Sequence, residues 1–532
     1  MSDKNQTWQE LHRPTPEKLS QARRVLEEVR RGRPVADAIR RHPLTGGGYV
    51  AKNMLVRAYR QLTESGDWSA DPALLARIRM KPVRTLSGVT TVTVLTKPYP
   101  CPGKCIFCPT DVRMPKSYLP DEPGARRGLE HNFDPYEQVA ARLNALEEVG
   151  HPTDKVELLV LGGTWSAYRR DYQEWFIRRC FEALNGVESS TLDQAQSVNE
   201  TAPNRNVGLV IETRPDHIDA EELAWLRYLG VTKVQVGVQS LDDRVLELNQ
   251  RGHITADSRK AAILLRSAGF KVVVHWMPNL LGSSLEADRI DFNRLWEHIF
   301  PDEIKIYPNQ LLENTELYEY WLRGEYQPYT TGELVSLIAD VKTTIPRYCR
   351  VNRVIRDIPS TYVVEGNKRT SLRQDVQKEL LIRGQACRCV RCREVRGQKV
   401  DVRALRMNDL VYSTDASEEH FLSFDTPEDR LAGFLRLSLP ASQAPSIGLS
   451  ELEQAALIRE VHIYGQSLPV GGEEKGAAQH IGLGARLIQN AEEIARQRGY
   501  ARLAVISAIG TRPYYLKLGF KRGELYMLKQ LQ

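Results

Sequence analysis

The sequence predicts an α/β protein built mainly on a parallel sheet that is covered by helices. Six short β-rich runs follow one another, at residues 90–96, 155–163, 207–214, 233–240, 271–278 and 303–308. Helical stretches lie between them, and alternating strands and helices specify a parallel sheet. Six such units predict a partial (β/α)6 barrel over residues 81–345, with further regions on either side.

Length and composition set the class of the chain. Its 532 residues suggest about three or four domains, and a content of 42% hydrophobic and 26% charged residues is typical of a soluble globular protein. The longest apolar runs have the length of strands, and the polar amino terminus has no apolar segment of the signal-peptide kind. We therefore expect a cytoplasmic protein with reduced thiols.

The first region, residues 1–80, is predicted to be a basic helical module. Residues 1–90 contain 17 Lys and Arg against 9 Asp and Glu, a net charge of +8, whereas the whole chain carries +6. The helical pattern is interrupted at Pro43 and at residues 46–48. A charge run is often only a solvated helix face, but this concentration in one module favours a polyanionic partner such as a nucleic acid.

The barrel is predicted to carry its working residues at the carboxyl ends of the strands. Several polar or glycine residues stand at these ends: Gly162, Gly163, Glu212, Arg214, Gln239, His275 and Lys305. Such a ring of polar residues indicates a site.

Directly after the first strand, Cys101, Cys105 and Cys108 form a C-x3-C-x2-C triplet. Three thiolates can hold three irons of a [4Fe–4S] cluster and leave the fourth iron open to an external ligand. The alternative is a zinc site completed by a distant residue.

Residues 346–400 are predicted to form a basic, zinc-binding linker. Cys387, Cys389 and Cys392 have the spacing C-x-C-x2-C, which favours structural zinc. Cys349 is our hypothesis for the fourth ligand. Residues 365–407 hold 12 Lys and Arg against 5 Asp and Glu, so the linker is a second basic surface.

The last region, residues 401–532, is predicted to be another α/β domain. Two strands, at residues 431–439 and 457–465, precede a glycine turn at residues 479–484 and a helix that ends at Gly499. A glycine turn at a helix amino terminus offers free N–H groups to a pyrophosphate. A G-x-G alone is weak, but here a strand and a short helix with two tyrosines follow in order.

The cysteine triplet, with Phe107 before its last cysteine, resembles the radical S-adenosylmethionine (SAM) enzymes. The resemblance implies that the methionine moiety of SAM chelates the open iron. It also implies that Gly162 and Gly163 accept the methionine amino group, and that Glu212 and Gln239 contact the ribose or adenine.

The carboxyl-terminal domain resembles the Gcn5-related N-acetyltransferase fold. The resemblance implies acetyl-CoA binding by Glu460, Val461, His462, Ile463, Leu483, Gly484, Ala485 and Tyr515. Tyr514 or Tyr515 would act as the acid at the thioester sulfur, and either tyrosine could instead be a core residue.

The combination is similar to the catalytic-subunit family of Elongator, which modifies uridine 34 of transfer RNA. Motifs shared with that family run from about residue 80 to the end, among them residues 154–165, 210–216, 459–465 and 504–520. Two features indicate a prokaryotic, stand-alone form of this family. One is the spacing between Cys101 and Cys105, and the other is the presence of the second cysteine group at residues 387–392.

The resemblance implies a mechanism that uses both halves of the chain. A deoxyadenosyl radical would abstract hydrogen from the methyl group of acetyl-CoA, the carbon radical would add to carbon 5 of uridine, and thioester hydrolysis would leave carboxymethyluridine. Acetyl-CoA would then have to reach the barrel mouth, with Lys155 as the barrel residue that contacts it.

Several partners follow from this reading. Transfer RNA would lie across the basic module and the linker, with its anticodon loop in the cleft, and an electron donor would serve the cluster. Two alternatives remain open: a protein lysine acetyltransferase with a structural iron–sulfur cluster, and a non-catalytic RNA-binding scaffold.

Overall fold

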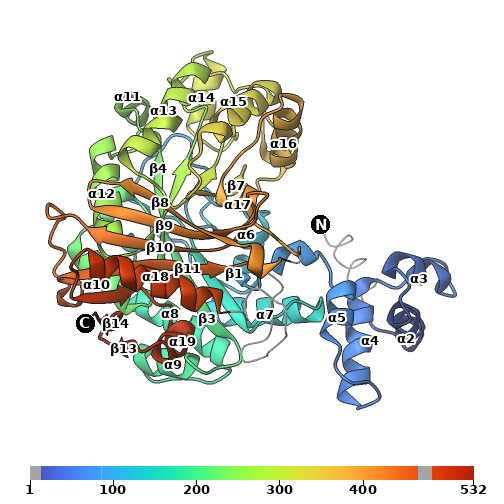
Figure 1. Ribbon diagram of the computed structural model, residues 1–532. Helices are drawn as coiled ribbons and strands as arrows, with labels where there is room; N and C mark the ends of the chain where they lie inside the picture. Colours follow the sequence, from blue (N-terminus) through green and yellow to red (C-terminus); the bar gives the residue numbers. More distant parts are fainter. Residues whose placement is uncertain (1–12, 86, 399, 465–481, 532) are drawn as a thin grey trace.

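The computed structural model describes residues 13–85, 87–398, 400–464 and 482–531 (Figure 1). A helical module lies to one side of a large body that contains two sheets. None of the helices in these ranges combines the length and the apolar character needed to cross a membrane.

Over its described residues, 13–80, the amino-terminal module has four helices and a core of its own. The helices are α2 (Pro16–Arg30), α3 (Val35–Arg41), α4 (Lys52–Glu64) and α5 (Pro72–Ile78). Apolar residues of α2 and α4, including Leu26 and Leu55, are fully buried between them. The module contacts the rest of the chain through α4 and α7 (Pro135–Glu148).

In the described residues, the first sheet has seven parallel strands in sequence order and does not close into a barrel. Its strands are β1 (Thr90–Leu95), β2 (Lys155–Leu161), β3 (Arg205–Thr213), β4 (Lys233–Gln239), β5 (Lys271–Trp276), β6 (Glu303–Ile306) and β7 (Arg350–Val354). Helices cover its outer face, among them α8 (Arg170–Asn185), α10 (Ala220–Tyr228), α12 (Thr255–Ser267), α13 (Leu285–His298) and α15 (Thr331–Thr344). Apolar residues pack between these helices and the strands.

The six predicted strands are present, but the prediction of six units was one strand short. β7 lies in the segment that we assigned to the linker. Its sequence, RVNRV, has arginine or asparagine at three of five positions, so the apolar pattern of a buried strand is missing. An edge strand with one side on a cavity can carry such residues.

The second sheet is mixed and also has seven strands, in the order β13-β14-β12-β11-β10-β9-β8. It contains β8 (Arg406–Ser413), β9 (Ser417–Asp425), β10 (Leu431–Pro440), β11 (Ala455–Ile463), β12 (Arg502–Val505), β13 (Lys521–Arg522) and β14 (Met527–Gln530). Helix α18 (Leu483–Gln497) packs on β10 and β11, and the short helix α19 (Arg512–Lys517) follows β12. The predicted strand–turn–helix–strand order is therefore present, after a β8–β9 hairpin that we did not predict.

A buried ion-pair cluster joins the two sheets. Arg459 on β11 donates two hydrogen bonds of 2.7 Å to Asp302, the residue before β6, and one of 2.7 Å to Glu419 on β9. All three side chains are buried. Arg436 on β10 also contacts Asp302 and donates to the carbonyl of Tyr348. Because Asp302 precedes β6, the second sheet is fixed to the amino-terminal end of the barrel.

We predict that Asp302→Asn destabilises the protein by about 3–5 kcal/mol, because it leaves buried arginines without their charge partner. The change is measurable as a lower midpoint of urea unfolding at neutral pH. Glu325→Gln, in the exposed Arg323–Glu325 pair, is the matched control and should leave the midpoint unchanged. Equal midpoints for both variants would contradict the role of the cluster.

Candidate active site

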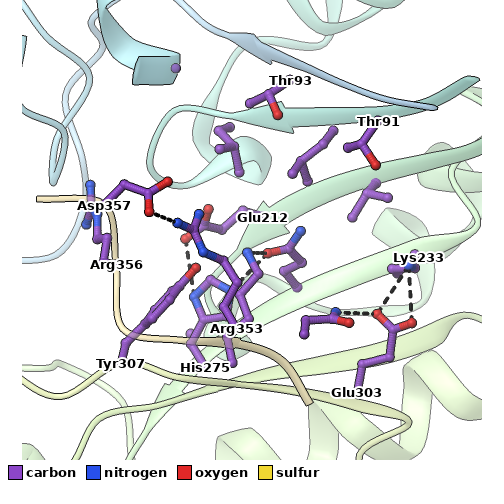
Figure 2. A pocket seen from close by; sticks show the side chains of 18 of the residues that line it. Thr91, Thr93, Glu212, Lys233, His275, Glu303, Tyr307, Arg353, Arg356 and Asp357 are labelled. Carbon is purple, nitrogen blue, oxygen red and sulfur yellow. Dashed lines mark hydrogen bonds and ion pairs between the residues drawn. The ribbon is translucent and has the colours of Figure 1, made fainter. Parts of the chain in front are cut away.

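The interior of the barrel is a cavity of about 1250 Å³ that runs along the strands. Alternate residues point inward, as strand geometry requires: for example residues 91, 93 and 95 on β1 and residues 233, 235, 237 and 239 on β4. Small and polar side chains dominate these positions, so the lumen is not filled as in a closed barrel. Figure 2 shows part of this lumen, with Thr91 and Thr93 on one wall.

The cysteine triplet lies at the carboxyl-terminal end of the lumen. Arg251 donates a hydrogen bond of 3.2 Å to the Sγ of Cys105, and the N–H of Gly103 donates one of 3.4 Å to the Sγ of Cys101. The hydrogen bond from Cys108 and the charge of Arg251 lower the pKa of Cys105 to about 5, against the effect of burial. A thiolate is therefore available here at neutral pH.

The spacing of these thiols suits a group larger than a single ion. Among the described residues, Cys387, Cys389 and Cys392 have their Sγ atoms within 4.8 Å of one another, and the triplet at 101–108 does not. Thiolates around one zinc ion lie about 4 Å apart, since Zn–S is about 2.3 Å. An iron–sulfur cluster fits the wider triplet.

Several buried polar atoms around the triplet have no partner among the described residues. They are the Nη1 of Arg214, the Oε1 of Gln239 and both ring nitrogens of His253. A Cβ at Gly103 would lie 2.4 Å from the Nη1 of Arg214, so this guanidinium is aimed at the cysteine loop. Unpartnered buried groups are costly, and their convergence fits a polar ligand at this place.

Gly162 and Gly163 follow β2 at the same end of the lumen. Both have positive φ, at 145° and 89°, and a Cβ on Gly162 would lie 1.7 Å from the Oγ1 of Thr96. Only glycine allows this backbone to approach both Thr96 and the cavity.

A chain of polar side chains crosses the middle of the lumen. His275 lies 3.4 Å from Glu212 and 2.9 Å from Gln235, and Lys305 also donates to Gln235. Glu212 accepts a hydrogen bond of 3.1 Å from Tyr118. Burial and the nearby Lys305 hold the pKa of His275 well below its usual range, so this imidazole is neutral at pH 7.

The amino-terminal end of the lumen is lined by ion pairs and closed by the second sheet. Lys233 contacts Glu303 at 3.2 Å (Figure 2) and Glu157 at 2.9 Å. Lys271 contacts Glu460 of β11 at 3.4 Å. Val461 and His462 line the same cavity, whereas Ile463 is not among its lining residues.

The strand predicted to contact acetyl-CoA lies at the opposite end of the barrel from the mouth at which we expected acetyl-CoA to arrive. We placed its arrival at the carboxyl-terminal mouth, beside the cysteines. The strand that should hold it, β11, instead faces the amino-terminal ends of the barrel strands. Lys155, the first residue of β2, lies half-buried at this same end, with its pKa lowered by burial.

The glycine turn and the two tyrosines lie beside β11. Gly482 has φ of 71° and precedes α18, which begins with Leu483, Gly484 and Ala485. A Cβ at Gly484 would lie 2.7 Å from the hydroxyl of Tyr514, which is 42% exposed. Residues 479–481 of the turn fall outside the described residues.

Tyr515 is the buried member of the pair, at 7% exposure, and packs edge-on against Phe520. Burial, with Tyr514 and Glu460 nearby, raises its pKa, so it keeps its proton at neutral pH.

The second cysteine group lies behind β7. Cys389 is fully buried, and Cys387 and Cys392 are half-buried. Cys349 is also buried, and its carbonyl accepts a hydrogen bond of 2.9 Å from the N–H of Val390, but its thiol is outside the set within 4.8 Å.

The sequence analysis predicted polar residues at the carboxyl ends of the strands and a basic linker, but it missed the rest of the polar lining and the fact that basic residues from several elements line one cavity. The basic residues come from the module end, α6 (Pro123–Glu130), β7, α16 (Leu372–Ile382) and the linker: Lys81, Arg127, Arg353, Arg373, Arg391 and Arg396. A signal for the lining was present, because four strands begin with Lys or Glu before apolar residues: KVELL, KVQVG, KVVVH and EIKI.

A cysteine triplet at the mouth of an open parallel barrel defines the class of radical SAM proteins. Residues 99–291 match the Radical SAM superfamily, and residues 301–381 match the Radical_SAM C-terminal domain.

Relatives narrow the class to one family. The chain is 44% identical to a tRNA uridine(34) acetyltransferase of Dehalococcoides mccartyi, over 84% of this chain and 99% of the relative. It is 36% identical to human Elongator complex protein 3, over 86% of this chain and 87% of the relative. The structure of Methanocaldococcus infernus Elp3 with an N-terminal deletion matches with a TM-score of 0.74 at 39% identity, covering 84% of this chain and all of that one. The chain belongs to the Elp3 family of tRNA uridine(34) acetyltransferases.

We predict that Gly162→Ala destabilises the protein by about 1–3 kcal/mol more than Gly186→Ala does, as expected for overpacking. Both glycines have positive φ, but 145° at Gly162 is less accessible to a residue with a Cβ than 71° at Gly186, and only position 162 has a side chain within reach of the new Cβ. Thermal unfolding compares the two variants. A larger loss at Gly186 would show that Thr96 does not restrict this turn.

Proposed function

We propose that this chain is a tRNA uridine(34) acetyltransferase whose radical SAM site and acetyl-CoA site act on one nucleotide to give 5-carboxymethyluridine. The observation that carries the proposal is the single cavity. It is lined at one end by Cys101, Cys105 and Cys108 and at the other by Glu460, Val461 and His462. The D. mccartyi relative, a tRNA uridine(34) acetyltransferase, supports the same interpretation.

The three cysteines would hold a [4Fe–4S] cluster with one open iron. When bound, the cluster and SAM supply hydrogen-atom abstraction from an unactivated carbon. The backbone at Gly162 and Gly163 would accept the methionine amino group, and the unpartnered Arg214 Nη1 and Gln239 Oε1 would bond other polar groups of the ligand. Glu212 would contact the ribose from its place between Tyr118 and His275.

The second sheet would bind acetyl-CoA as a Gcn5-related acetyltransferase domain. β11 pairs with β12 only up to Ile458 and then continues to Ile463, so the two strands separate where an acyl arm would enter. The left-handed Gly482 exposes the first N–H groups of α18 to a pyrophosphate. Tyr515, protonated and beside Glu460, would donate a proton to the thioester sulfur.

The RNA would bind through the basic module and the linker. The rim arginines support this, because Arg373 and Arg391 donate to backbone carbonyls and form no ion pair with a carboxylate in the part of the chain that the structure describes. Burial, with Arg391 nearby, lowers the pKa of Arg373 to about 10, which indicates unneutralised positive charge. Phosphates would supply the missing negative charge, and the target base would enter the lumen unstacked.

The linker would bind zinc through Cys387, Cys389 and Cys392. Their Sγ atoms lie within 4.8 Å of one another, which suits one tetrahedral ion. The bound ion would stabilise a short segment that has little hydrophobic core of its own. The thiol of Cys349, our original fourth ligand, lies outside this set.

We predict that tRNA stimulates acetyl-CoA hydrolysis by the anaerobically reconstituted full chain, and that Tyr515→Phe lowers this rate, because the departing thiolate then lacks its acid. Hydrolysis is followed by free-thiol release, with and without tRNA. Cys101→Ala is the control and should keep hydrolysis while carboxymethyluridine is lost. If the rate of acetyl-CoA hydrolysis is the same with and without tRNA, and the chain acetylates lysine peptides, it would instead be a protein acetyltransferase.

A further inference from the structure

Two exposed aromatic side chains lie outside the barrel lumen, beside the cysteine loop. Tyr99, in the loop itself, is 37% exposed, and Trp175, on α8, is 36% exposed. Neither residue lines the central cavity. Exposed aromatic side chains that gather in one place mark a surface for a partner protein.

A continuous stack of rings joins these two residues into one patch. Tyr99 stacks on Tyr168 with ring centroids 4.7 Å apart, and Tyr168 stacks on Tyr172 at 5.2 Å. The ring of Tyr172 lies 5.6 Å from that of Trp175. The Nζ of Lys97 lies over Tyr172, 4.7 Å from the ring centroid. These contacts fix the rings, so the aromatic patch is preorganised for binding.

The aromatic patch reaches the cysteine triplet. Tyr99 is two residues before Cys101, whose Sγ lies 3.6 Å from the Oγ1 of Thr164. Thr164 is four residues before Tyr168, whose hydroxyl donates a hydrogen bond of 3.1 Å to the carbonyl of Gly162. A partner seated on the rings would therefore be separated from the cysteines by only a few packed side chains.

The loop beside the aromatic patch is basic. Residues 96–104 contain Lys97 and Lys104 and no acidic residue. Both lysines are exposed and form no ion pair within the described part of the chain. On α8, Asp171 is paired with Arg169 at 2.6 Å, so this pair adds no net charge. An acidic protein surface is the electrostatic complement of such a loop.

We propose that the aromatic patch and its basic loop form the docking surface for the electron donor of the cluster. The donor is a small acidic protein that carries a one-electron flavin or iron–sulfur group. It is oxidised by one electron as the cluster is reduced by one, without transfer of an atom or proton, and the tyrosine and tryptophan rings keep their oxidation state. Electron-transfer complexes are small, about 1,200 Å² or less, so a patch of this size suffices. The inference rests on the cluster assigned in the proposed function.

The position of the aromatic patch favours an electron carrier over RNA. The RNA is proposed to bind at rim residues that line the cavity, such as Arg373 and Arg391. The exposed rings do not line the cavity. A carrier at this surface could deliver electrons while the substrates occupy the lumen.

The first test uses the anaerobically reconstituted full chain, with a bacterial flavodoxin hydroquinone as the probe. Stopped-flow loss of cluster absorbance gives the second-order rate constant of reduction. At low salt, Lys97→Glu and Arg169→Glu should each lower this constant about tenfold, because a reversed charge opposes an acidic partner. Lys260→Glu, at an exposed position of α12, is the matched control and should keep the wild-type constant. Reduction by dithionite shows that each variant still holds a reducible cluster.

The second test examines the rings and the contact itself. Trp175→Ala should lower the rate constant about fivefold, as expected for truncation of an interface aromatic residue. Its control is Leu322→Ala on α14 (Leu317–Leu322), where an apolar side chain is 57% exposed. Carbodiimide joins lysines to carboxylates of bound flavodoxin, and peptide mass spectrometry should find Lys97 or Lys104 among the joined residues, and not Lys260.

Several outcomes would overturn the docking surface. Wild-type rate constants in Lys97→Glu and Arg169→Glu, or cross-links confined to other faces, would exclude it. Weaker tRNA binding by Lys97→Glu with an unchanged rate constant would assign the aromatic patch to RNA. If Lys97→Glu loses the cluster, Arg169→Glu decides, because that side chain is 76% exposed. A wild-type chain without a reducible cluster would remove the proposed function as well, whereas the other outcomes leave it standing.

Discussion

The structure depends on the buried contact between Arg459 and Asp302. This pair, with Glu419, holds the second sheet against the amino-terminal end of the barrel. A buried ion pair is not by itself a source of large stability, because both ions lose their water, but its geometry is demanding. The pair therefore fixes how two separate cores meet. The position of β11 and the closed end of the lumen both follow from this one contact.

The lumen in turn gives the two halves of the chain a shared space. Radical chemistry requires a site from which water is excluded, and the barrel walls provide it. An open sheet of seven strands leaves room that a closed barrel of eight would fill with side chains. Many of the polar residues inside have partners within the lumen: Lys233 pairs with Glu157 and Glu303, and Gln235 bonds His275.

The sequence predicted the elements whose pattern is local. Six apolar strands, the cysteine triplet and the turn before α18 were each visible within about ten residues. β7 was missed because Arg350, Asn352 and Arg353 remove its apolar pattern. The approach of the second sheet could not be derived, since Arg459 and Asp302 are 157 residues apart and nothing local marks them as partners.

The most direct test of the shared lumen is to obstruct it at its middle. Thr93→Phe places a ring on the inward face of β1, between the cysteine loop and β11. Its control is Thr343→Phe, at an exposed position of α15. Three quantities are measured on the reconstituted full chain: SAM cleavage, acetyl-CoA hydrolysis, and carboxymethyluridine in tRNA by nucleoside mass spectrometry. The account predicts that Thr93→Phe keeps both partial reactions and loses the modified nucleoside. Wild-type amounts of carboxymethyluridine in this variant would contradict a reaction inside the barrel.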